Sequence, residues 1–219
     1  MKHRIPCRLP SRRAFSLVEL LVVICIIIVL AVLTVPAFSN ISRGSNLTTG
    51  GTRLVDQLEL ARQAAMTRNC PVEFRIYQLP KAGDPPNGSP AVYRAFQVFS
   101  LDADGTQTNA LTRVTMLPDN VYIVPGVAVS SLLDTQQGTS PSLVTAPAKP
   151  LGDYPAGSYR YVAFRFKPNG GTDLNAAPAK SWHLSLALTG DAMGSLGVPD
   201  NFFTVQLNAL TGRTRLFRP

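Results

Sequence analysis

Positions 12–20 carry the sequence RRAFSLVEL, and this stretch decides how the rest of the chain is interpreted. Two arginines precede the small residue Ala14, and the aromatic residue Phe15 follows it. One acid, Glu19, then stands directly before an apolar run that ends at Pro36. A basic leader, a small residue and a lone acid at the start of an apolar helix form an uncommon combination, and together they indicate a cleaved leader.

The apolar run is long enough to cross a bilayer. Leu20 to Val35 is a stretch of 16 residues without charge, and extending it to Phe15–Pro36 gives 22 residues with Glu19 as the only charge. About 20 apolar residues span a bilayer core as a helix. Residues 1–14 hold five basic residues and no acid, a bias that keeps this end in the cytoplasm. We therefore predict one membrane span over residues 15–38, with the remainder across the membrane.

Glu19 is the residue of this segment that needs a reason. A carboxylate at membrane depth costs roughly 2.5–3.5 kcal/mol at the centre and less near the interface, and it usually has a functional partner. Cleavage after Ala14 would place a new α-amino group on Phe15, four residues earlier on the same helical face. The alternative is that Glu19 only favours the first helical turn and reaches toward the interface.

The whole arrangement resembles the processing and assembly signal of type IV pilins and of type II secretion pseudopilins. That signal is a small residue, usually Gly, followed by Phe, Ser or Thr, Leu, any residue and Glu; here Ala14 replaces the Gly. The resemblance implies that prepilin peptidase cleaves between Ala14 and Phe15 and methylates Phe15. It implies that Glu19 pairs with the terminal amine of a neighbouring subunit, and that Pro36 kinks the helix.

The resemblance also implies partners and a location. The partners would be prepilin peptidase, other pilin or pseudopilin subunits and an inner-membrane assembly platform. The precursor would be a single-pass inner-membrane protein with a periplasmic head, and the assembled fibre would lie in the periplasm or at the cell surface.

Beyond Pro36 the pattern predicts that the helix continues to residue 69. Poor helix formers at 42–45 and 50–51 predict local loosening. From residue 47 to 69 the helix is amphipathic, and one apolar stripe at heptad-like spacing consists of Leu47, Leu54, Leu58, Ala61 and Ala65. The sequence Asn69-Cys70-Pro71 then ends the helix, because the residue before a proline avoids helical angles.

Residues 70–219 alternate apolar and polar side chains in short runs separated by turns, as antiparallel strands do. The expected strands cover 72–77, 91–101, 114–117, 121–124, 159–166, 182–188, 202–207 and 214–217, and Val92, Phe96 and Phe99 are expected in the core. Residues 134–158 are rich in Pro, Ser, Thr, Gln and Gly, which predicts a flexible loop. The fold class is therefore α+β: a long N-terminal transmembrane helix packed on an antiparallel β-sheet head.

This layout resembles the head of the H-type minor pseudopilins in the segment 60–72 and in Thr211-Gly212-Arg213. More narrowly, the segments 46–48, 56–58 and 93–97 resemble protein D of the Verru_Chthon cassettes. The N-terminal resemblance covers residues 12–38, and the head resemblance rests on shorter motifs.

Charge and composition argue against other classes. The formal charge is +8, but the five basic residues of the leader account for most of it, and from Phe15 onward 16 basic residues stand against 13 acids without clustering. No nucleic-acid partner is expected. His183 is the one histidine beyond the leader and has no acid or nucleophile near it in sequence, so we predict no catalytic residues and no enzyme activity.

No cofactor or metal is expected either. Asp102 and Asp104 before Gly105 lack the spacing of a calcium loop and are better explained by a β-turn. Cys25 and Cys70 are too far apart along a helix to form a disulfide.

Three alternatives remain open on sequence. An ordinary signal peptide could be cleaved near Val35-Pro36-Ala37, although its apolar core would be longer than usual. The chain could be a membrane-anchored or secreted binding domain that never polymerises. An extracytoplasmic enzyme is the third.

Overall fold

The structure is a computed structural model that describes residues 16–80, 91–102, 108–135, 140–177, 181–191, 194 and 199–218, without the side chains of 33–42. The chain divides into two compact units, Met1–Ser42 and Arg43–Pro219. One helix, α1 (Leu17–Arg68), provides the described part of the first unit and the first element of the second.

Within the described residues, no helix offers a stretch long and apolar enough to cross a membrane.

The end of α1 follows the predicted signals. Asn69 adopts a positive φ of 49°, the left-handed conformation that closes many helices. Pro71 follows two residues later, where a helix cannot continue. The chain then enters its first strand at Val72, as the change of period predicted.

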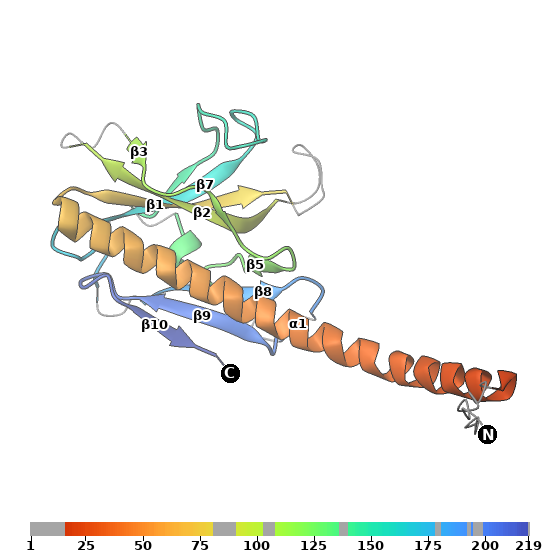
Figure 1. Cartoon of the computed structure of the whole chain (residues 1–219). Coiled ribbons are helices and arrows are strands. Elements are labelled where there is room, and N and C mark those ends of the chain that lie inside the picture. The colour runs from red at the N-terminus through yellow and green to blue at the C-terminus, as the bar shows by residue number, and fades with distance from the viewer. Residues whose placement is uncertain are drawn as a thin grey trace, which may run out of the picture. The chain divides into compact units, whose positions relative to one another are not determined.

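A large antiparallel sheet forms the rest of the second unit, so this unit is α+β (Figure 1). The strands among the described residues are β1 (Val72–Leu79), β2 (Val92–Leu101), β3 (Thr108–Ala110), β4 (Thr115–Met116), β5 (Val121–Ile123), β6 (Ser142–Val144), β7 (Arg160–Phe166), β8 (Trp182–Leu188), β9 (Phe202–Leu207) and β10 (Thr214–Phe217), with a 3-10 turn, η1, at Ser131–Leu133. Their order in the sheet is β10-β9-β8-β5-β2-β1-β7-β6, and β3 and β4 pair with β2.

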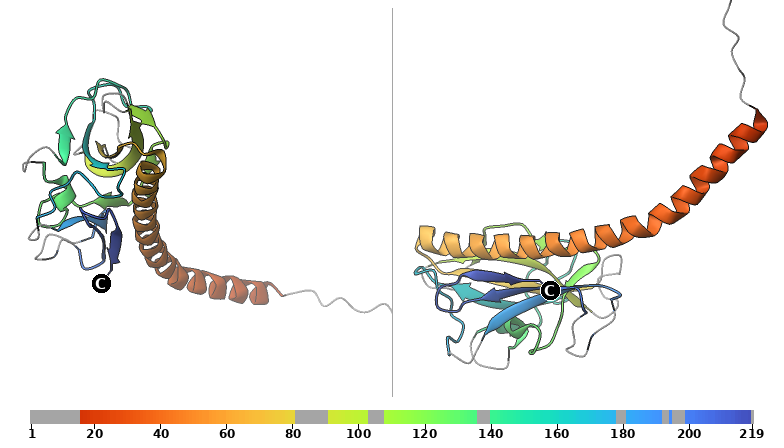
Figure 2. Two further views of the ribbon diagram at one scale, coloured as in Figure 1. Left: turned by 90° about the vertical axis from the view of Figure 1, so that its left-hand side faces the viewer. Right: turned by 90° about the horizontal axis from the view of Figure 1, so that it is seen from below.

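The sheet has two halves, and the strand pairing that joins them is short. Strands β1, β2 and β7 pair over seven or more positions each, and β8 pairs with β9 over six. The two halves meet where β2 pairs with β5 through Tyr93 and Ile123. The part of α1 after residue 43 lies across both halves (Figure 2).

The apolar stripe of α1 is confirmed as a core face. Leu47, Leu54, Leu58, Ala61 and Ala65 are each fully buried, whereas Leu60 between them is 39% exposed. The stripe packs against residues from both halves of the sheet, including Phe96 from β2 and Phe203 from β9. Because a fully buried leucine contributes about 1.5–3 kcal/mol relative to an exposed one, this stripe is a main source of stability for the second unit.

The opposite face of β1, β2 and β7 carries a second, smaller core. It consists of Tyr77, Leu79, Ala95, Leu151 and Tyr159. Two of the predicted core residues of β2 need correction here: Phe96 faces the helix as expected, but Val92 and Phe99 are only half-buried. Phe99 lies an odd number of positions from Phe96, so it points to this second face.

The segment 134–158 was predicted to be a flexible loop without structure; its described part contains paired residues, and its flexibility stays a prediction. Residues 142–144 form β6, which pairs with β7, and Leu151 pairs with Tyr154 in an isolated bridge. The Tyr159 hydroxyl donates a 2.7 Å hydrogen bond to the Lys149 carbonyl. The segment therefore covers the second face of the sheet, and its polar composition reflects one exposed side.

Candidate functional site

Ser16 and Glu19 form a reciprocal cap at the start of α1. The backbone N–H of Ser16 donates to Glu19 Oε2 at 2.9 Å, and the backbone N–H of Glu19 donates to Ser16 Oγ at 3.2 Å. This is the capping-box arrangement, which satisfies two N–H groups that have no partner inside the helix. Glu19 thus has a local structural partner in addition to any role in assembly.

The other predicted processing residues lie outside what the structure describes. Ala14 and Phe15 precede the first described residue, Ser16. Pro36 lies within the bounds of α1, but its side chain is outside the described set, so the predicted kink stays a prediction.

Gly50 and Gly51 were interpreted as weak points of the helix, and this interpretation is wrong. The helix continues through both residues. A Cβ on Gly50 would lie 3.1 Å from Val121 Cγ1, and a Cβ on Gly51 would lie 2.3 Å from the Phe203 ring. At these glycines the helix backbone lies too close to the sheet for a side chain to fit without a shift, which offsets their low helix propensity.

Polar contacts also link α1 to the sheet and its loops at both ends of the packed segment. Arg43 forms an ion pair with Asp191, and Asn46 donates a 3.0 Å hydrogen bond to Asn120. Near the other end, Arg62 donates to the Thr211 carbonyl at 2.8 Å. The register of the helix on the sheet is therefore set by directional contacts as well as by the apolar stripe.

A buried charge cluster lies on the second face of the sheet. Register pairing places Glu73 of β1 directly opposite Arg165 of β7. Glu73 is 6% exposed and accepts hydrogen bonds from Arg75 Nε at 2.6 Å and Arg165 Nε at 3.2 Å. An acid this buried requires paired charge, and two arginines supply it.

Arg75 is held by aromatic rings as well as by Glu73. Its guanidinium carbon lies 4.0 Å from the centre of the Phe99 ring and 4.7 Å from that of Tyr161, both distances suited to cation–π attraction. Burial alone would lower the pKa of Arg75, but the Glu73 carboxylate and the neighbouring tyrosines raise it above the usual arginine value. Arg75 is therefore a permanent, immobilised cation.

Three tyrosines surround this cation. Tyr77 stacks edge-on against Tyr159 and Tyr161, with ring centres 5.7 and 5.6 Å apart. The Tyr77 hydroxyl donates a 3.0 Å hydrogen bond to Gln97 Oε1. Burial raises the pKa of all three tyrosines, most strongly that of Tyr77. Sequence reasoning missed this cluster, although the alternation of Glu73, Arg75 and Tyr77 along one strand was visible.

His183 is a packing residue in this structure. The Ser131 hydroxyl accepts a 2.9 Å hydrogen bond from the His183 backbone and lies 3.1 Å from its Nδ1. Its Nε2 lies 3.3 Å from the Ala128 carbonyl. The ring therefore helps to fix η1 against β8, and among the described residues its hydrogen-bond partners include no carboxylate that would orient it as a base.

Metal and disulfide chemistry find no site in the described residues. No group of three or more His, Cys, Asp or Glu side chains in that part of the chain could hold an ion. Cys25 and Cys70 are both free thiols. Residues 103–107 lie outside the described part of the chain, so the β-turn expected there stays a prediction.

Comparisons with known proteins give structural similarities at low sequence identity. No protein-family model matches the chain, and no curated protein matches it. Among solved structures, the minor pseudopilin EpsH of the Vibrio cholerae type 2 secretion system aligns at 15% identity and a TM-score of 0.43, covering 80% of this chain and 98% of that one. The Pseudomonas aeruginosa type IV minor pilin FimU aligns at 14% identity and a TM-score of 0.43, covering 80% and 93%. Similarities of this size carry no functional inference.

Proposed function

We propose that the chain is the precursor of a pilin-like subunit that assembles into a type II secretion pseudopilus or a type IV pilus-like fibre. Prepilin peptidase cleaves it between Ala14 and Phe15 and methylates Phe15. Residues 15–38 then anchor the subunit in the inner membrane, and the sheet forms a periplasmic head. Its partners are other subunits and the assembly platform, and its role is structural, without catalysis.

The observation that carries this proposal is the N-terminal sequence itself. Five basic residues, a small residue, Phe15 and Glu19 precede an uncharged run of 16 residues, and each part has a separate physical requirement in a processed membrane subunit. An ordinary signal peptide needs neither the acid nor so long a core.

The described contacts add support from the other end of the helix. The stripe from Leu47 to Ala65 is buried against the sheet of its own chain, so it is not available to a partner helix. The largest apolar surface that α1 leaves for assembly contacts is its N-terminal segment, where all the apolar residues from Leu17 to Val32 are exposed within this single chain. In the proposed membrane-anchored fibre, lipid and neighbouring helices bury that apolar surface.

The proposal assigns Glu19 to the terminal amine of a neighbouring subunit. An intramembrane carboxylate without a partner is costly, so an amine on Phe15 of the adjacent copy would stabilise the contact between subunits. The backbone N–H of Ser16 donates to Oε2, and Glu19 remains exposed within this single chain, where a neighbouring amine can approach it.

Crosslinking of subunits in membranes tests this assignment. The full chain carrying Glu19→Ala should reach the membrane and be cleaved, but its crosslinked multimers should fall to the level of the uncrosslinked sample. Ser16→Ala is the control, because it removes the capping hydroxyl, at a cost of about 1 kcal/mol, and keeps the acid.

If both variants lost multimers equally, the cap alone would explain Glu19. If Glu19→Ala kept the multimers of the parent, the acid would have no assembly role. A parent without multimers would favour a membrane-anchored binding domain that does not polymerise.

A further inference from the structure

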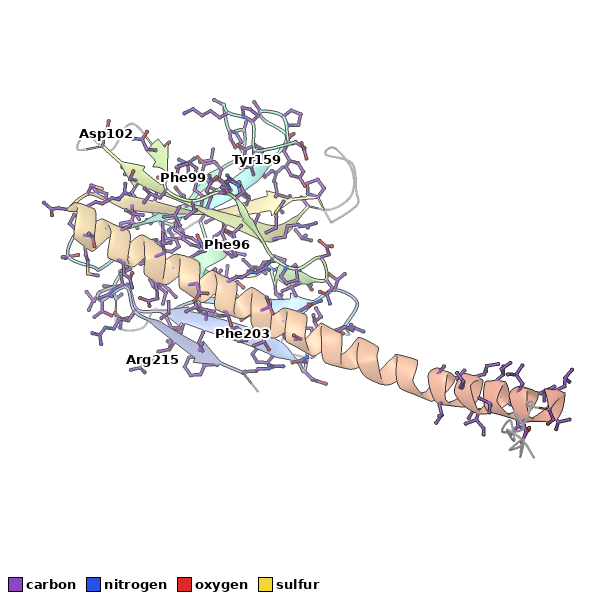
Figure 3. The ribbon with its side chains drawn as sticks, viewed as in Figure 1. Phe96, Phe99, Asp102, Tyr159, Phe203 and Arg215 are labelled. Carbon is purple, nitrogen blue, oxygen red and sulfur yellow. The ribbon has the colours of Figure 1, made fainter. Side chains whose placement is uncertain are left out.

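A hollow of about 530 Å³ lies on the second face of the sheet, beside the buried charge cluster. Residues from β1, β3, β7 and the segment before β7 line it, and those with polar groups are Arg75, Thr108, Asn109, Lys149, Tyr159 and Tyr161. Figure 3 shows Tyr159 and Phe99 on the side of the sheet away from the helix. The volume is within the range of about 300–1,000 Å³ that small-ligand sites occupy.

The charge of this hollow is one-sided. Arg75 and Lys149 line it, and none of the described residues that line it is acidic. Glu73 lies next to Arg75, but it is buried and paired with both Arg75 and Arg165. Its single negative charge offsets one of these two positive charges, so the site keeps a net positive charge. A ligand that carries one negative group is therefore favoured over a neutral or cationic one.

Arg75 is prepared for such a group. Its guanidinium is fixed by Glu73 and by the rings of Phe99 and Tyr161, and 15% of its side chain stays exposed. A guanidinium that is already immobile loses little freedom when it binds a carboxylate, and its planar fork matches the two carboxylate oxygens.

The remaining lining indicates the rest of the ligand. Tyr159 and Tyr161 supply flat rings with hydroxyl groups, and burial raises the pKa of both. The Tyr159 hydroxyl already donates to the Lys149 carbonyl, so toward a ligand its oxygen is an acceptor. Thr108 and Asn109 supply a hydroxyl and an amide from the other side. This combination suits a ring-shaped molecule that has an apolar face and many hydroxyls at its edge.

We propose that the hollow binds an acidic sugar, a uronic acid unit whose carboxylate pairs with Arg75 and Lys149 and whose ring lies against Tyr159 and Tyr161. This binding goes beyond the assembly role and does not depend on it, because every residue involved belongs to the second unit. The head would then attach to a saccharide that carries carboxylates, and the sheet face away from the helix would be the contact surface.

The test is ligand-observed NMR titration of the full chain in a zwitterionic detergent that contains no sugar. Glucuronate is the probe. Glucose tests the contribution of the sugar ring without the carboxylate, and acetate tests the carboxylate without the ring. Glucuronate should bind saturably, at least about tenfold more tightly than either comparison ligand, since each of those lacks one half of the contacts.

Lys149→Gln should weaken glucuronate binding about tenfold, and Asn109→Ala should weaken it without a change of charge. Both residues are exposed, so the fold is retained, as an unchanged melting temperature would confirm. Lys167→Gln is the matched control: Lys167 is also exposed but follows the far end of β7 and does not line the hollow. No saturable binding, equal binding of acetate or glucose, or an equal loss in Lys167→Gln would overturn the proposal.

Discussion

At the scale of single residues, close approach and pairing explain what composition could not. Gly50 and Gly51 are poor helix formers that the helix nevertheless contains, because a side chain at either position would meet Val121 or Phe203. Glu73 is a charged residue in a buried strand position, and it is tolerated because two arginines from β1 and β7 reach it.

Substitution of Gly51 tests the close approach. Gly51→Ala should lower the free energy of unfolding by about 1–3 kcal/mol relative to Gly44→Ala, measured by urea denaturation of the full chain in detergent. Both changes gain the same helix propensity, so the difference between them reports packing. A Cβ on Gly44 would meet nothing nearer than Arg218, at 3.9 Å. Equal stability of the two variants would mean that the Phe203 ring moves aside without cost.

The buried Tyr77 hydroxyl should make the folded chain less stable at alkaline pH. Burial raises its pKa above the ordinary value of 10.0, so above that pH the unfolded chain releases the proton while the folded chain retains it. The contribution is therefore fully present below about pH 10 and is lost as pH rises further. Urea unfolding from about pH 8 to about pH 11 should show a steeper decline in the parent than in Tyr77→Phe, which has no proton to release. Parallel declines would assign the alkaline loss to other groups.

At the scale of elements, α1 and the C-terminal strands were the most predictable parts. The stripe on α1 follows from its spacing, and β8, β9 and β10 have the predicted bounds, 182–188, 202–207 and 214–217. Strands β8 and β9 alternate clearly and are followed by Gly190 and Asn208, and Gly212 marks the turn before β10, so local sequence suffices.

The short strands β3 and β6 could not be predicted in the same way. Each has three residues, too few for a period, and each exists because a neighbour, β2 or β7, offers an unpaired edge. The charge cluster escaped prediction for a related reason: Glu73 and Arg165 are 92 positions apart, and only the register of β1 on β7 brings them together.

Leu58 and Leu60 provide a matched test of the helix stripe. Leu58 is fully buried and Leu60 is 39% exposed, two positions away on the same helix. Leu58→Asp should cost several kcal/mol and unfold the second unit, because it buries an unpaired charge. Leu60→Asp should change stability by less than about 1 kcal/mol. Circular dichroism melting distinguishes them, and similar melting temperatures for both would show that the stripe is not core.

At the scale of the whole molecule, the two units divide the work in our proposal. The first unit, Met1–Ser42, holds the leader, Glu19 and the apolar run, and the second, Arg43–Pro219, holds the sheet with its own helix cover. The contacts of the helix with the sheet begin before the predicted amphipathic segment, since Arg43 pairs with Asp191. A shortened chain that began at Gly51 would lack the Arg43 ion pair and the buried Leu47 side chain, so the natural boundary of the second unit is Arg43.

The central claim is that the chain is a processed, pilin-like membrane subunit, and its mature N-terminus tests this most directly. The full chain should be produced in cells that contain prepilin peptidase, extracted from membranes and analysed by N-terminal sequencing and mass spectrometry. The account predicts that the mature chain begins at Phe15 with a methylated α-amino group. A chain that begins at Met1, or at Phe38 after cleavage as an ordinary secreted protein, would contradict it.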